Sequence, residues 1–92
     1  MEEQEETLVQ MGEEADVLLK ADIFNKTVNS LVESSFQTFC NTKPEETEQR
    51  ERSYHHYRAL VEIVATLQQR VAVKDEIVAK TQQKQGNDKD HE

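Results

Sequence analysis

The sequence predicts an all-α protein, an antiparallel helical hairpin with a long second helix. Apolar residues recur at spacings of three and four through the second half of the chain, as in Leu60, Val64, Leu67 and Val71. Two glycines and one proline leave few places for turns in 92 residues. A third of the residues are charged and none is Trp, a balance typical of long amphipathic helices rather than sheets.

The N-terminus is acidic. Residues 1–22 hold eight acidic residues and one basic residue, Lys20, whereas acids and bases nearly balance in the rest of the chain. We expect residues 1–6 to form a flexible acidic arm, and the helical hairpin to occupy residues 7–81.

The first helix of the hairpin is predicted over about residues 7–41. Its apolar residues, among them Phe24, Val28 and Leu31, fall on one broad face. Gly12 weakens the early part, and Asp22 favours the N-cap position of a new helix. The pattern therefore allows one bent helix, or a short helix of about 13–20 followed by a longer one of about 23–41 with a break near residue 22.

The connection between the two halves is marked by Pro44, which suits the first turn of a helix. Thr42 and Glu45 have the spacing of a capping box. The sequence therefore predicts a second helix over residues 44–81. Because the connection is short, the two helices should lie antiparallel, with partner numbers that sum to about 84.

This register predicts the hairpin core. It sets Phe24 near Leu60, Val28 near Tyr57 and Val17 near Leu67, with Lys74 interrupting the apolar stripe. The predicted core consists of Phe24, Val28, Leu31, Tyr57, Leu60, Val64, Leu67 and Val71. Residues 82–92 are polar and lack periodicity, so we expect a disordered tail.

The second helix carries more apolar surface than one partner helix needs. Val73 and Ile77 lie round from the main stripe, and the segment from Arg50 to Arg58 mixes basic and aromatic residues. These features are typical either of an ordinary solvated surface or of a second contact surface through which copies associate. The candidate partner interface consists of Val73, Ile77, Arg50, Tyr54 and Arg58.

No catalytic or metal-binding pattern is present in the sequence. His55 and His56 are adjacent, so they point about 100° apart on a helix, whereas metal-binding pairs on a helix are three or four residues apart. We expect Cys40 to be a structural thiol near the end of the core. We therefore predict no enzyme activity, cofactor or metal, and the net charge of −8 argues against direct binding to nucleic acid.

The sequence also bears on location. The N-terminus is acidic rather than basic and then apolar, so we expect no secretion signal. No apolar run approaches the roughly 20 residues of a membrane span. The single cysteine excludes an intrachain disulfide and fits a reducing interior.

Several residues around the turn carry a resemblance. Leu18-Leu19 precede Phe24, a Thr42-x-Pro44 turn follows, and then come Arg50-Glu51, Tyr54 and the run from Leu60 to Gln68. This arrangement resembles small helical-hairpin proteins encoded among the head and tail genes of tailed bacteriophages. The resemblance implies a coiled-coil-like structural protein, made in the host bacterial cytoplasm and incorporated in the virion, with itself or other phage proteins as partners.

Two functions follow as expectations. The first is a non-enzymatic structural or assembly protein that acts by helix packing and self-association. The alternative is an acidic regulatory protein, an inhibitor or adaptor that engages a basic protein partner.

Overall fold

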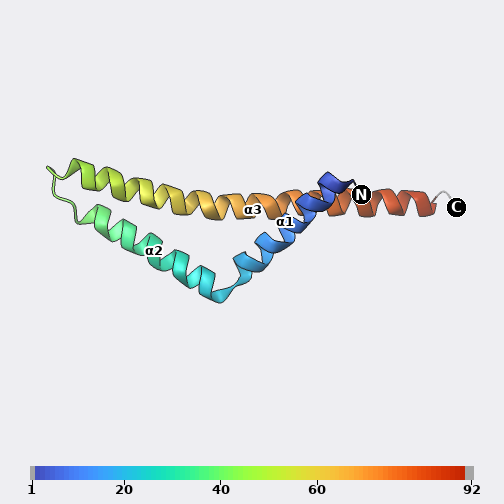
Figure 1. Ribbon diagram of the computed structural model, residues 1–92, viewed down its shortest axis with the longest axis horizontal. Coiled ribbons are helices and arrows are strands. Elements are labelled where there is room, and N and C mark those ends of the chain that lie inside the picture. Colours follow the sequence, from blue (N-terminus) through green and yellow to red (C-terminus); the bar gives the residue numbers. More distant parts are fainter. Residues whose placement is uncertain (1, 91–92) are drawn as a thin grey trace. The chain divides into compact units, whose positions relative to one another are not determined.

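The protein is all-α. The computed structural model describes residues 2–90, with side chains described through Lys84, and these residues contain no strand. Three helices follow one another: α1 (Glu3–Lys20), α2 (Asp22–Cys40) and α3 (Thr47–Asp90) (Figure 1). The long C-terminal helix packs against the first two, which confirms the prediction of an all-α chain with a long last helix.

The chain divides into two compact units. The terminal unit combines most of α1, up to Leu18, with the part of α3 from Leu67 to Asp90. The turn unit spans Leu19–Thr66 and pairs α2 with the first half of α3. Each unit is a two-helix arrangement, and α3 contributes one half to each.

The first half of the chain is two helices that break at Ala21. The backbone of Ala21 is extended, with φ −72° and ψ 123°, and Ala21 occupies the N-cap position of α2. Asp22 therefore lies in the first turn, where it pairs with Lys26 at 2.9 Å, and the expected capping by Asp22 is wrong. The amide of Asn25 joins the two helices, since Nδ2 donates to the carbonyl oxygens of Leu19 at 2.8 Å and Ala21 at 3.1 Å.

The connection from α2 to α3 differs from the predicted capping box. The backbone N–H of Glu46 donates to the Lys43 carbonyl at 2.9 Å, which makes residues 43–46 a turn with Pro44 in its second position. The Glu46 carboxylate in turn accepts from the Lys43 N–H at 2.9 Å. A fixed proline φ suits this turn as well as it suits a helix start, so α3 begins at Thr47 rather than at Pro44.

Both ends are more helical than expected. α1 begins at Glu3, inside the predicted flexible arm, and three of its acids occupy the first turn, where the helix dipole favours negative charge. α3 continues through residues 82–90, for which the sequence predicted a disordered tail. Residues 91 and 92 of that predicted tail lie outside the described part of the chain.

Gly12, which is buried in the middle of α1, makes a close approach to α3 in the terminal unit. A Cβ atom at this position would lie 2.7 Å from the Arg70 carbonyl oxygen and closer still to the Lys74 Cβ. The expected register, with partner numbers that sum to about 84, falls between these two contacts. Lys74 is therefore accommodated in the apolar stripe because the helix opposite it has no side chain there.

Candidate functional site

Some of the predicted core residues are half-buried in the structure, and others are exposed. Phe24, Val28, Leu60, Val64, Leu67 and Val71 are half-buried, in line with their places on the facing sides of the helices. Leu31 is 49% exposed and Tyr57 39% exposed. Val17, which the register set near Leu67, is 71% exposed. Among the described residues, Ala15 is the one hydrophobic residue that is buried.

The candidate partner residues fall in three groups. Val73 and Ile77 are half-buried rather than exposed. The expected register, with partner numbers that sum to about 84, sets Met11 and Leu8 of α1 near Val73 and Ile77, and their half-burial agrees with that pairing. Tyr54 is 50% exposed and Arg58 is also exposed, so both are accessible to a partner.

Arg50, the fifth candidate, is engaged within the chain. Its Nε donates to Thr42 Oγ1 at 3.1 Å, and its Nη2 donates to the carbonyl oxygens of Lys43 at 2.8 Å and Pro44 at 3.2 Å. The guanidinium therefore holds the turn between α2 and α3 against the first turns of α3. We assign Arg50 a role in stabilising this turn.

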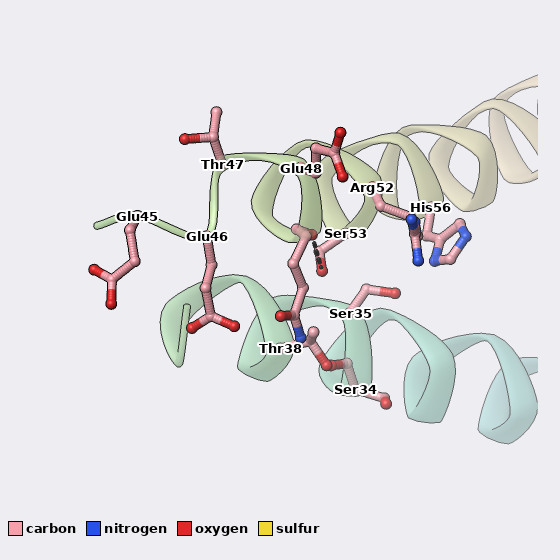
Figure 2. A pocket seen from close by; sticks show the side chains of 11 residues that line it. Ser34, Ser35, Thr38, Glu45, Glu46, Thr47, Glu48, Arg52, Ser53 and His56 are labelled. Atoms are coloured by element: carbon pink, nitrogen blue, oxygen red, sulfur yellow. Dashed lines mark hydrogen bonds between the residues drawn. The ribbon is translucent and has the colours of Figure 1, made fainter. Parts of the chain in front are cut away.

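An open, polar hollow of about 690 Å³ lies on one side of the turn unit. Figure 2 shows the hydroxyl side chains of Ser34 and Thr38 on α2 across from Arg52 and His56 on α3. Ser53, buried between them, donates from Oγ to the Gln49 carbonyl at 3.0 Å. The hollow is wide, open and polar, and we assign it no chemistry.

The residues considered for chemistry are not brought together. The rings of Tyr54 and His55 meet edge to face, with their centroids 5.9 Å apart. His56 points into the polar hollow instead (Figure 2). Among the described side chains, from residue 2 to Lys84, no three His, Cys, Asp or Glu residues are grouped so that they could hold a metal ion. Cys40, expected as a structural thiol near the end of the core, is exposed.

An apolar surface lies on the side of the turn unit away from the polar hollow. Two residues along a helix correspond to about 200° of rotation. Phe36 is two residues from both Ser34 and Thr38, and Tyr54 is two residues from both Arg52 and His56, so both rings point away from the hollow. Phe36 is 58% exposed. We call Phe36, Tyr54, Tyr57 and Val61 the aromatic face.

The sequence reasoning missed two residues of this molecule. Phe36 belongs to the run of apolar residues in its helix, but its spacing from Val28 and Val32 puts it at the edge of the inner face. Gly12 was read as a weak point in a helix. The position of Lys74 could have indicated the role of Gly12. A charged residue within an apolar stripe packs well only when the residue opposite it on the facing helix is small.

No helix in residues 2–90 is long and apolar enough to cross a membrane. Comparisons with protein-family models, curated proteins and solved structures found no match for this chain.

Proposed function

We propose that this protein is a non-enzymatic structural or assembly protein that acts by helix packing and self-association. The observation that carries the proposal is the amount of large apolar surface left uncovered. Among the described residues, ten large hydrophobic side chains are exposed, from Leu8 in α1 to Ile63 in α3. Scattered apolar residues are normal on a surface, but here they outnumber the buried hydrophobic residues of the described chain.

A small domain gains stability when such surface is covered. Each Val, Leu, Ile or Phe side chain taken out of water contributes roughly 1.5–3 kcal/mol. Two-helix units bury little of their own surface, and association with further copies is a common solution for small domains. Helix packing of this kind needs no cofactor or catalytic group. The setting, assembly of a tailed bacteriophage, rests on the resemblance of residues 15–80 alone.

Light scattering over a range of protein concentrations and salt concentrations tests the proposal. We expect the mass to rise above that of one chain as concentration increases. High salt should preserve or strengthen the association, because apolar contacts persist while the repulsion between chains of charge −8 is screened. One-chain mass at every concentration would refute self-association.

The acidic regulatory function remains a second candidate because α1 presents several exposed carboxylates, among them Glu3, Glu6 and Glu13. Deleting the N-terminus would not test it cleanly, since residues 3–14 belong to α1 and include the buried Gly12. The sharper variant is Glu3→Gln, Glu6→Gln and Glu13→Gln together. Under this function the variant keeps its fold, as measured by circular dichroism. It no longer binds a basic partner protein whose binding to the natural chain is weakened by salt. Unchanged capture of that partner would rule this function out.

A further inference from the structure

The aromatic face extends along α3 as a stripe of its own. Tyr54, Tyr57, Val61 and Ala65 follow one another at spacings of three, four and four, so they share one side of the helix. Of these, Tyr54, Tyr57 and Ala65 are exposed and Val61 is half-buried. The stripe lies beside the residues that pack on α2, and Phe36 of α2 points to the same side of the turn unit.

The composition of this face suits a protein interface. Aromatic residues and Arg are enriched where proteins meet, and they contribute most of the binding energy. Tyr54, Tyr57 and Phe36 are rigid rings, and Arg58 stands directly beside them. With about 150–250 Å² per aromatic side chain, their exposed fractions amount to roughly 300 Å². That is a substantial part of the roughly 800 Å² that each partner contributes to a stable complex.

The order of residues along the stripe makes it complementary to itself. If two copies of α3 cross antiparallel on a two-fold axis close to residues 60 and 61, numbers that sum to about 121 lie opposite each other. Val61 then meets Val61 of the other copy, and the large Tyr57 meets the small Ala65. The exposed Arg58 meets the exposed Glu62, so opposite charges face each other on the flank of the stripe.

A parallel alignment in register does not have these properties. It would place the Arg58 residues of the two copies on opposite flanks of the stripe, and likewise the Glu62 residues, so the Arg58–Glu62 pairs of the antiparallel arrangement would be lost. It would also set Tyr57 on Tyr57, and would leave Ala65 opposite Ala65 with a gap. Both size and charge therefore favour the antiparallel two-fold arrangement.

We propose that two copies of this chain pair through the aromatic face, with their α3 helices antiparallel on a two-fold axis near Val61. This inference rests on the proposed self-association and identifies the surface and the alignment that produce it. Phe36 of each copy closes the edge of the interface from α2. The polar hollow, on the other side of the turn unit, stays open.

Disulfide trapping tests the alignment. Cys40→Ser removes the exposed native thiol, and Val61→Cys is added in that background. A residue on a two-fold axis lies beside its own copy, so mild oxidation should link most Val61→Cys chains into covalent dimers. The matched control is Ile63→Cys, because Ile63 is 50% exposed but lies about 200° round the helix from Val61. Equal or faster linking at position 63 would overturn the proposal.

A charge exchange supplies an independent readout. Arg58→Glu alone and Glu62→Arg alone should each raise the dissociation constant about tenfold, since two attractive pairs become repulsive. The double variant Arg58→Glu with Glu62→Arg should restore association to within a few-fold of the natural protein. Failure of the double variant to recover would overturn the alignment.

These outcomes separate the two proposals. A natural chain that stays at the mass of one copy refutes self-association as a whole. A natural chain that associates while the Val61→Cys and charge-exchange results fail refutes the aromatic face alone, and leaves the proposed function standing.

Discussion

Gly12 and Lys74 are one structural feature formed by two residues. Gly12 lets the backbone of α1 come close to α3, and the aliphatic stem of Lys74 fills the space that a side chain on α1 would occupy. The Lys74 ammonium extends to Asp75, where Nζ and Oδ1 are 3.4 Å apart. A long basic side chain can thus serve as apolar packing while its charge stays near water.

The substitution Gly12→Ala tests this contact through the sign of its effect. In an open helix the change stabilises by about 1 kcal/mol, because alanine is the better helix former. Here the added methyl group overlaps the Arg70 carbonyl oxygen and the Lys74 Cβ, and overpacking of this kind costs about 1–3 kcal/mol. We expect a net loss of stability in urea unfolding. Glu13→Ala, at the exposed neighbouring position, is the control and should change little. Stabilisation by Gly12→Ala would show that the helices do not approach there.

Arg50 supports a second prediction at the same scale. Arg50→Ala removes three hydrogen bonds to the turn and should destabilise the protein by about 1–3 kcal/mol. Arg50→Lys should restore little, because an ammonium cannot reproduce the guanidinium fork. Arg52→Ala, at an exposed position two residues on, is the matched control. Equal effects of the Arg50 and Arg52 variants in chemical unfolding would contradict the role assigned to Arg50.

At the scale of elements, Ala21 is where the first half of the chain divides into α1 and α2. Its backbone already has the extended N-cap conformation, but the alanine side chain makes no capping hydrogen bond. Ala21→Ser should therefore stabilise the protein by about 1 kcal/mol, the usual gain from a side-chain cap. In a continuous bent helix the same change would destabilise slightly, because serine is a poorer helix former. Ala59→Ser, at an exposed mid-helix position, measures that penalty in the same thermal unfolding experiment.

The elements show what periodicity can and cannot predict. Spacings of three and four correctly predicted an all-α chain with a long last helix, and the register that they gave agrees with the Gly12 contact. The helix boundaries were less accurate, because proline fits both a turn and a first helical residue, and because polar residues can continue a helix without an apolar stripe. The side on which Phe36 lies depends on how wide a face its partner helix covers, and spacing alone does not give that width.

For the whole molecule, apolar surface favours association and net charge opposes it. The chain carries a charge of −8, concentrated near its N-terminus, whereas the aromatic face lies in the turn unit and carries both Arg58 and Glu62 on its flank. Repulsion between copies should therefore weaken as salt is added. The exposed rings then determine whether two copies remain together.

Sedimentation equilibrium of the natural chain tests this account most directly, because it measures mass without assuming a molecular shape. The account predicts that the mass rises from 10.7 kDa for one chain toward a multiple of that value as the concentration reaches the micromolar range. It also predicts that Tyr54→Ser with Tyr57→Ser shifts the curve toward one chain, while Ile63→Ser does not. A mass of 10.7 kDa at every concentration and salt condition would contradict it.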